Sequence, residues 1–391
     1  MGLRVDVVRS AREQEALAKF RYRVYVEELK LIAPEAADGE RRQLRDPLDH
    51  VSISWAIFDR DEVIGSLRMT PMKAIKDLTS LVGKFDFESA IRLFGASAIV
   101  TTSRFIVDPR AKGGTAMLRM MTACFEEARR QGARLNYGDC SPGLLLFYEH
   151  MGYRRYVRPY NDPLYGFKLP IVMLFDQERL RIVGSPLYRV SLKYPRDQSV
   201  IDWFESTYRE HVDNESAPFI DIGTFMSRVS AQLPGKLALG HIFEGLSDDD
   251  LQRLLAKASI FRVYPGDLVL RPGERAGALF LVLNGEMMIV VSQGNHASSR
   301  GVLTSGDFFG NVDEITLQPP NCEVQARSET LLLVAPMDHV KRFLAMRPSG
   351  PLLEKKLRAY VRSESSASFA LPCGADEHAM ALSRNCAPRC L

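Results

Sequence analysis

The segment SRFIVDPRAKGGTAMLRMM, residues 103–121, constrains the fold of this chain more than any other. An apolar run rich in β-branched residues ends near a proline. A short loop with two glycines follows, and a helical pattern begins directly afterwards. The helical pattern rests on apolar side chains that recur on one face: Met117, Leu118, Met121, Phe125 and Ala128. A strand that leads through a tight loop into a helix is the repeating unit of α/β folds, so the first part of the chain is predicted to be α/β.

The neighbouring segments extend the alternation. VSISWAIFD and EVIGSLRMTPM read as strands joined by a turn, RLNYGD as another strand, and PGLLLFYEHMGY as a helix capped by Gly152. From about residue 241 short strands alternate with glycine turns, which is typical of a β-sandwich or jelly roll. We therefore predict a mixed sheet flanked by helices at 1–185, a helical linker at 186–240, a β jelly roll with a C-terminal helix at 241–362, and a disordered tail at 363–391.

The composition limits the classes of partner. A chain of 391 residues has room for two domains and a linker. Its 51 Lys and Arg residues are spread among 48 acidic residues, and no helix-turn-helix follows the second domain, so we expect no nucleic-acid partner. The apolar runs are too short for a membrane span and the N-terminus has no signal core, so a cytoplasmic location is expected. The six cysteines form no CxxC pair, so we expect reduced thiols and no metal.

The loop in residues 108–114 suits a bound phosphate. Gly113 and Gly114 allow the backbone to approach an anion closely, and the following helix presents free N–H groups and the positive end of its dipole. Arg110 and Lys112 add positive charge. By itself such a loop is only a weak indication of a phosphate site.

A second element downstream strengthens this indication. The strand, loop and helix, followed at the usual distance by LLLFYEHMGYRRY, resemble the GCN5-related acetyltransferase superfamily over roughly residues 1–175. The resemblance implies that Tyr148 faces the thioester sulfur and protonates the leaving thiolate. It also implies that an acyl thioester donor is held through its pantetheine and phosphates by Ile106, Val107, Arg110, Lys112, Gly113, Gly114 and Thr115. The loop is slightly shorter than the superfamily pattern.

A narrower resemblance covers four blocks of the same domain. FRYRVYVEE, RDPLDH, VIGSLRMTP and TTSRFIV, in this order, resemble the acyl-homoserine-lactone (autoinducer) synthases and the long-chain N-acyl amino acid synthases. Those enzymes take an acyl chain from acyl carrier protein or acyl-CoA. Thr101 and Leu31 replace the glutamate and tryptophan usual in autoinducer synthases, so lactone formation is not expected, while N-acylation of another amine remains. The matching residues are Arg21, Tyr25, Asp46, Asp49, Arg68, Ser103, Arg104 and Phe105.

The chemistry of such a reaction needs few groups. An amine attacks a thioester carbonyl, a backbone N–H stabilises the oxyanion, and a base removes the amine proton. The candidate bases are Asp46, Asp49, Asp139, Glu149 and His150. We predict as catalytic residues Tyr148, Asp139, Arg68, Ser103 and Arg104. We predict as amine-binding residues Arg21, Asp46, Asp49 and Thr101.

Structural roles compete with these assignments. Asp46 and Asp49 can simply shape a turn beside Pro47. Arg68 and Arg104 can form structural ion pairs, and the tyrosine of the second element can pack as a core aromatic.

The remaining polar residues of the domain are less informative. Glu149 and His150 read as solvated helix residues rather than bases, and Cys140 has no histidine partner for a nucleophilic role. An acyl carrier protein is acidic and would dock on a basic rim. Two sets of arginines are available for such a rim: Arg129, Arg130 and Arg134, or Arg154, Arg155 and Arg158.

The second half resembles the cyclic nucleotide-binding domain family, from IFEGLSDDDLQRLL to LLLVAPMDHVKRFL. Members that bind a cyclic nucleotide place a glutamate after an FG pair for the ribose and an arginine for the phosphate. Here Asn311 and Pro320 occupy these positions, and Asn321 and Cys322 follow. The cassette that begins at Gly310 is therefore degenerate, and binding of cAMP or cGMP is not expected. Such a domain can instead serve as a structural or homo-oligomerisation module.

The sequence thus predicts an N-acyltransferase that moves an acyl group, of fatty-acid type, from a carrier-protein or CoA thioester to an amine such as an amino acid. Two alternatives stay open. One is an acetyl-CoA-dependent acetyltransferase, acting on protein lysines under control of the second domain. The other is a non-catalytic binding or scaffold protein that retains both folds.

We expect isothermal titration calorimetry to detect no saturable binding of cAMP or cGMP by the full chain. Loss of the arginine–phosphate clamp costs a few kcal/mol, which is roughly two decades of affinity or more. A cAMP-binding member of the family is the positive control. A Kd in the micromolar range or tighter would contradict this reading of the cassette.

Overall fold

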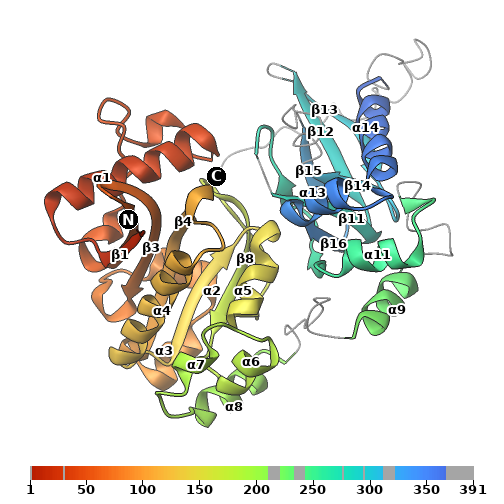
Figure 1. Cartoon of the computed structure of the whole chain (residues 1–391). Helices are drawn as coiled ribbons and strands as arrows, with labels where there is room; N and C mark the ends of the chain where they lie inside the picture. Colours follow the sequence, from red (N-terminus) through yellow and green to blue (C-terminus); the bar gives the residue numbers. More distant parts are fainter. Residues whose placement is uncertain are drawn as a thin grey trace, which may run out of the picture.

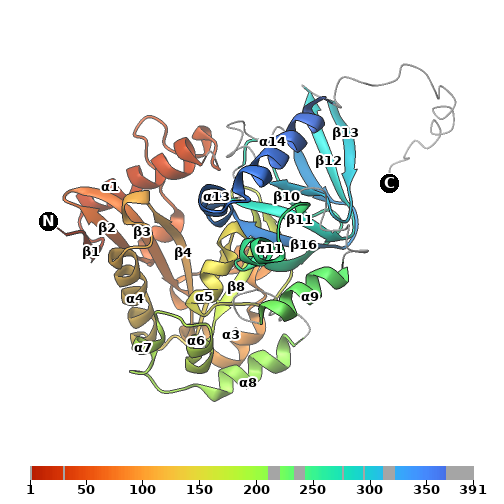
Figure 2. The same ribbon diagram turned by 45° about the vertical axis from the view of Figure 1, so that its right-hand side comes forward.

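The computed structural model describes residues 2–29, 31–209, 221–232, 243–274, 277–293, 296–310 and 322–366. It consists of an N-terminal α/β domain, drawn in red to green in Figure 1, and a C-terminal domain made mainly of β-strands, drawn in green to blue. The two domains lie side by side in both views (Figure 2). The predicted fold class is confirmed for both parts of the chain.

One eight-stranded sheet forms the centre of the first domain. Its strand order is β1-β2-β3-β4-β5-β8-β6, with β7 paired to β8. β4 and β5 run parallel, and the other neighbours run antiparallel. The strands are β1 (Arg4–Val7), β2 (Ile53–Asp59), β3 (Glu62–Pro71), β4 (Ile99–Val107), β5 (Leu135–Cys140), β6 (Arg154–Arg155), β7 (Tyr160–Asp162) and β8 (Gly166–Met173).

Helices cover both faces of this sheet. They are α1 (Ala11–Tyr22), α2 (Thr79–Phe85), α3 (Glu88–Phe94), α4 (Thr115–Arg130), α5 (Leu145–Met151), α6 (Gln177–Ile182), α7 (Tyr188–Ser191) and α8 (Gln198–Thr207). α1 begins with a capping box, in which Ser10 Oγ accepts from the Glu13 N–H and the Glu13 carboxylate accepts from the Ser10 N–H. After α1 the chain continues into a π-helical segment, η1 (Arg23–Glu28).

Alternation along the strands divides the core between the two faces. On β2, Trp55 and Ile57 point into the cluster that contains α4, whereas Ala56 and Phe58 pack with α1. On the α1 side, the strands β4, β5 and β8 are covered by α2, α3 and α8. On this face of the sheet, one group of apolar side chains packs with α1 and another with α8. Between the two groups, neighbouring strands carry a row of polar side chains at paired positions: Ser54, Arg68 and Ser103.

The second domain consists of two four-stranded antiparallel sheets, with the orders β10-β15-β12-β13 and β14-β11-β16-β9. Gly310 ends β14 with a φ of 122°, and a Cβ there would lie 2.4 Å from the Ala278 carbonyl oxygen, so the position requires glycine. The strands are β9 (Ser259–Val263), β10 (Leu268–Leu270), β11 (Ala278–Asn284), β12 (Met287–Gln293), β13 (His296–Leu303), β14 (Phe308–Gly310), β15 (Glu323–Ala326) and β16 (Thr330–Pro336).

The helices of the second domain pack on the outer face of one of its sheets. Leu279, Leu281 and Leu283 of β11 lie in the cluster that these helices form, whereas Phe280 and Val282 face the other way. The helices are α9 (Ile222–Gln232), α11 (Asp248–Leu255), α13 (Met337–Met346) and α14 (Gly350–Ser366).

The two domains share one apolar core. A single cluster of buried side chains runs from Phe167 on β8 to Phe261 and Phe280 in the second domain, and the rings of Phe167 and Phe261 stack at 6.1 Å. The buried Arg155 donates to the Ile260 carbonyl oxygen at 2.6 Å. The second domain is therefore packed against the first and is not only tethered to it.

The interval predicted as a linker contains helices that complete both cores. Val200 and Phe204 of α8 are buried against the first sheet, and Phe225 and Val229 of α9 are buried in the second domain. The predicted tail lies outside the described residues beyond Ser366. Within the described residues, no helix has the length and apolar character needed to cross a membrane.

Candidate active site

A β-bulge distorts β4 at the centre of the first domain. Arg68 on β3 pairs with Ser103 and Ser66 pairs with Ile106, so two residues of β4, Arg104 and Phe105, lie opposite the single residue Leu67. The first of them, Arg104, has a φ of 56°, a left-handed conformation that is strained for a residue with a side chain. β4 pairs with β5 only as far as Thr101, so the two parallel strands part just before the bulge. Strained backbone of this kind is common at functional sites.

Beside the bulge, two carboxylates and three guanidinium groups form one network. Arg21 Nη1 donates to both oxygens of Asp49 at 2.8 and 2.9 Å, and Arg68 Nη1 donates to Asp49 at 3.1 Å. The same nitrogen of Arg68 lies 2.9 Å from Asp46, which also forms an ion pair with Arg104. All five residues were predicted from the sequence as catalytic or amine-binding residues, and the structure brings them together.

Local structure fixes both carboxylates. Asp46 caps the short 3-10 turn Pro47–Val51: its side chain accepts from the Leu48 N–H, and the Asp49 side chain accepts from the Asp46 N–H at 3.0 Å. The turn-shaping role that the sequence permitted for these residues is therefore present together with the ion pairs. Ser103 Oγ accepts from Arg68 Nε at 3.1 Å, which places the third residue of the polar row in the network.

The electrostatic balance of the network holds the carboxylates ionised. Burial alone would raise the pKa of the Asp46 carboxyl, but Arg68 and Arg104 outweigh it and hold that pKa well below its usual range. For Asp49, burial is likewise opposed by Arg21 and Arg68, and its pKa is lowered. A carboxylate with a lowered pKa is a weak base, so this balance disfavours both residues as the base. Three cations face two anions, which leaves one excess positive charge in the network.

Two tyrosines enclose the strained arginine. The Arg104 guanidinium lies 5.5 Å from the ring centroid of Tyr25 and 4.8 Å from that of Tyr165, and it donates to the Tyr165 hydroxyl. Tyr25 belongs to the π-helical segment after α1, a distortion that is frequent at functional sites. Tyr165 lies in the turn between β7 and β8. It was not predicted as a site residue, although the segment NDPLYG does carry a turn signal.

Tyr148 lies on the other side of the bulge. Its ring packs against Phe105, Phe147 and Tyr153, with centroid distances of 6.3, 5.3 and 5.5 Å. Burial, with smaller effects from Cys140 and other neighbours, raises the pKa of Tyr148 well above its usual value. The phenol is therefore protonated at neutral pH and has a proton to donate. The core packing that the sequence permitted for this residue is therefore present.

Asp139 lies near this tyrosine. Its Oδ2 accepts from the Tyr160 hydroxyl at 2.9 Å, and its charge is among those that raise the pKa of Tyr148. The adjacent Cys140 is buried, and burial raises the pKa of its thiol, so it does not supply a thiolate. Thr101 is buried on β4 opposite Thr70.

The predicted phosphate loop stands at the start of α4. Gly113 has a φ of 71° and Gly114 occupies the N-cap position before Thr115, as the sequence indicated. The two cations of the loop are already partnered: Arg110 pairs with Glu62 and Asp108, and Lys112 pairs with Asp338 of the second domain. Ile106 and Val107 end β4 directly before this loop.

Several sequence assignments need correction. Glu149 was read as solvated, but it is 3% exposed and pairs with Arg155 at 2.8 Å, because α5 turns this residue into the core. Arg155 is buried and Arg154 pairs with Asp176 at 2.6 Å, so only Arg158 of that set is exposed enough for a basic rim. His150 is exposed, as expected. Of the other set, Arg134 pairs with Asp197, and Arg130 is exposed.

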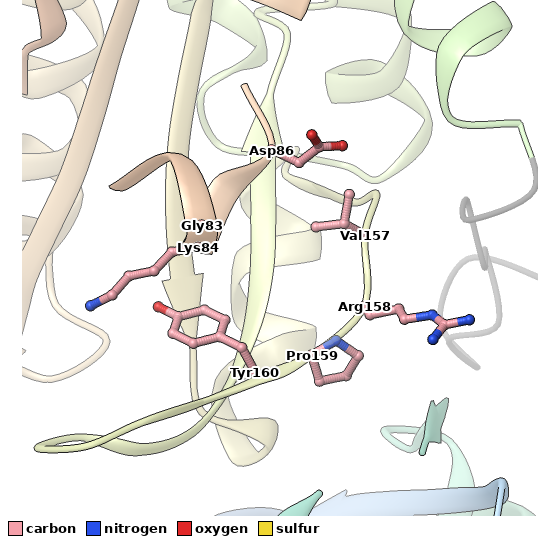
Figure 3. A pocket seen from close by; sticks show the side chains of 7 residues that line it. All are labelled: Gly83, Lys84, Asp86, Val157, Arg158, Pro159 and Tyr160. Atoms are coloured by element: carbon pink, nitrogen blue, oxygen red, sulfur yellow. The ribbon is translucent and has the colours of Figure 1, made fainter. Parts of the chain in front are cut away.

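A cavity of about 350 Å³ lies beside β7. Figure 3 shows the Lys84 amino group and the Tyr160 hydroxyl on one side of it, with Arg158 pointing the opposite way. Tyr160 connects this cavity to Asp139, whereas Tyr148 and the charge network do not line it. A second cavity, of about 290 Å³, lies at the domain junction, where Arg158 covers the Tyr264 ring at 4.0 Å.

The nucleotide cassette of the second domain is only partly within the described residues. Gly310 and Cys322 bound it, and Cys322 is partly buried against the shared core. Asn311 and Asn321 lie outside the described residues.

The fold and the site define a two-domain protein with an acyltransferase-type domain followed by a sandwich domain of the cyclic nucleotide-binding type. Residues 20–122 match the family model described as the acetyltransferase (GNAT) domain, and residues 260–347 match the cyclic nucleotide-binding domain. The first domain thus matches the GNAT-type acetyltransferase model over part of its length, and the second matches the cyclic nucleotide-binding domain model.

Individual proteins resemble one half of the chain each. The potassium channel AKT2/3 of Arabidopsis thaliana is 28% identical over 93 residues, which span 24% of this chain and only 12% of the channel. The structure of TofI in a ternary complex with an inhibitor and MTA is 21% identical, covers 47% of this chain and 97% of that one, and gives a TM-score of 0.38. The structure of the catabolite activator protein of Thermus thermophilus is 19% identical. The match covers 32% of this chain and 59% of that chain, with a TM-score of 0.29.

We expect Asp46→Asn to lower the free energy of unfolding by about 3 kcal/mol at pH 7, because two buried guanidinium groups lose their counter-charge. The folded pKa of Asp46 is depressed, so its stabilisation is present above the unfolded pKa of roughly 4 and is lost as the pH falls through the folded pKa. Denaturant titrations at a series of pH values measure this.

The matched control is Asp61→Asn, which removes an exposed partner of Arg12 and should change the stability by less than about 0.5 kcal/mol. Equal effects of the two substitutions at pH 7 would show that the network is not a buried ionic core.

Proposed function

We propose that the first domain is an N-acyltransferase that moves an acyl group, of fatty-acid type, from a carrier-protein or CoA thioester to the amine of an amino acid. The observation that carries this proposal is the partly buried charge network at the bulge of β4, the strand that places Phe105 against Tyr148 and leads into the predicted donor loop.

The excess positive charge of the network supports an acceptor that carries a carboxylate. Arg21 Nε is buried and has no hydrogen-bond partner among the described residues, so this cation retains an unused donor. A buried donor without a partner is costly, and a bound carboxylate would satisfy it. Arg104, at the strained position of β4, lies where such a carboxylate would neutralise the remaining charge. A simple alkylamine would gain nothing from this arrangement.

The donor would enter along the unpaired edges of β4 and β5. Beyond Thr101 the two strands no longer exchange hydrogen bonds, so backbone N–H groups of the bulged segment are free to bind the thioester. One of them would stabilise the oxyanion as the amine attacks. The N-terminus of α4 behind Gly113 and Gly114 would hold a phosphate of the donor, with its N–H groups supplying most of the interaction since the loop cations are paired.

The proton transfers fall to two neighbouring residues in this proposal. Asp139 takes the proton from the attacking amine, directly or through a water. Tyr160 holds its carboxylate, and its charge is near enough to affect the pKa of Tyr148. Tyr148, whose phenol is protonated at neutral pH, gives its proton to the thiolate as the C–S bond breaks. The paired carboxylates of the network stay ionised throughout and orient the acceptor.

The test incubates the purified full chain with acyl carrier protein thioesters and CoA thioesters of two to sixteen carbons and a library of amines, including each amino acid and its methyl ester. Mass spectrometry should find N-acyl amino acids from the longer donors, and the methyl esters should be poor acceptors because they lack the carboxylate. Transfer of acetyl groups alone, or of any chain to protein lysines in preference, would overturn the proposal.

For Tyr148→Phe we expect kcat to fall by roughly 10²-fold or more with little change in the KM of either substrate, as for loss of a positioned general acid. Steady-state kinetics with the best donor and acceptor measure this. Tyr188→Phe, in which a tyrosine packed on the same core changes far from the bulge, is the control and should retain full activity. A wild-type rate for the Tyr148 variant would exclude it as the acid.

A further inference from the structure

The turn between β7 and β8 is held from two sides. On one side the Tyr165 hydroxyl accepts from Arg104, the strained residue of the candidate site. On the other side Arg271 of the second domain donates to the backbone carbonyl oxygens of Asp162 at 2.8 Å and Pro163 at 3.0 Å. Residues of two domains therefore meet at the short turn between β7 and β8: Arg104 of the candidate site and Arg271 of the second domain.

Further contacts attach the second domain to this hairpin. Asn161 Nδ2 donates to the Leu268 carbonyl oxygen at 2.6 Å, and the Leu268 N–H donates to Asn161 Oδ1 at 3.1 Å. The Asn161 side chain on β7 thus pairs with the backbone of β10 through two hydrogen bonds, as a neighbouring strand would. Gly166 has a φ of 74°, and a Cβ there would lie 2.3 Å from the carboxylate of Glu274. The loop that follows β10 thus lies directly against the start of β8.

The turn itself is stiff. Asp162 Oδ1 accepts from the N–H groups of Leu164 and Tyr165 at 2.9 and 3.0 Å, and its other oxygen accepts from Lys84 at 2.6 Å. Asp162 is buried, so these bonds lie out of solvent. A displacement of the Asp162 and Pro163 carbonyls would therefore move Tyr165 with them.

Arg104 depends on its surroundings, because a left-handed conformation persists only where neighbouring contacts determine it. Its contacts are Asp46 and the two tyrosines, and only Tyr165 among them is attached to the second domain. The hydrogen bonds from Arg271 to the turn are charge-assisted and so are stronger than those between neutral groups.

From this geometry we propose that the cyclic nucleotide-binding-like domain is a structural part of the acyltransferase site, with Arg271 as a positioning residue that acts through the β7–β8 turn and Tyr165 on Arg104. The inference rests on the proposed function where it concerns catalysis, but the mechanical link concerns the fold alone. It assigns to the second domain a role that needs no nucleotide.

The test is a double-mutant cycle on the full chain with Arg271→Ala and Tyr165→Phe. Each single variant should lower kcat/KM for the amine by about tenfold, as for loss of one charge-assisted hydrogen bond, with the KM of the thioester donor unchanged. In the Tyr165→Phe background, Arg271→Ala should lower kcat/KM for the amine by less than about twofold, because both residues act through the β7–β8 turn. Arg271→Lys should recover part of the loss, since a lysine can still donate to one carbonyl.

Arg253→Ala is the matched control, because this exposed arginine of the same domain pairs with Asp249 within α11 and does not touch the hairpin. It should behave as wild type. Strictly additive losses in the double variant, or an Arg271→Ala variant that also behaves as wild type, would overturn the proposal.

Hydrogen exchange separates this inference from the proposed function. In Arg271→Ala, the amides of Tyr165 and of the bulged segment of β4 should exchange at least about tenfold faster, while those of α11 stay unchanged. If the wild-type chain transfers no acyl group to any amine, the proposed function fails and this readout still decides the link. Unchanged exchange at both places would overturn the link whether or not the chain is active.

Discussion

Ion pairs between two partly buried carboxylates and three arginines determine most of the first domain's site. Asp46 and Asp49 join the turn before β2 to α1, β3 and β4 through Arg21, Arg68 and Arg104. Removing charges from water is costly, and such a network stabilises a fold only where geometry and additional hydrogen bonds are good. Here the carboxylates also cap their own turn, so each accepts several hydrogen bonds. The excess cation that remains is then available to a ligand.

The bulge of β4 and the network depend on each other. The bulge places Arg104 against Asp46 and Phe105 against Tyr148, so one distortion supplies both halves of the candidate site. Arg271 of the second domain donates to the β7–β8 turn, and Tyr165 of that turn accepts from Arg104 of the bulge. The stacked rings of Phe167 and Phe261, in the apolar core that the two domains share, fix the second domain against β8. A packing role of this kind does not depend on a bound nucleotide.

Sequence patterns could predict the residues of the network because four short blocks carried them in order, and ion pairs need only matching charges at the right strands. They could not predict the left-handed Arg104, since the extra residue of a bulge leaves the apolar pattern of β4 almost unchanged. Tyr165 and Arg271 were missed because each acts through contacts between segments far apart in the chain. Glu149 was misread because a single charged residue on a short helix gives no sign of a buried partner.

The most direct test of this account is a crystal structure of the full chain with a non-transferable thioether analogue of a long-chain acyl donor and an amino acid. The account predicts the amino acid carboxylate against Arg21 or Arg104, the sulfur beside Tyr148, and a donor phosphate at Gly113 and Gly114. A donor bound away from the bulge of β4, or an acceptor that leaves the charge network untouched, would contradict it.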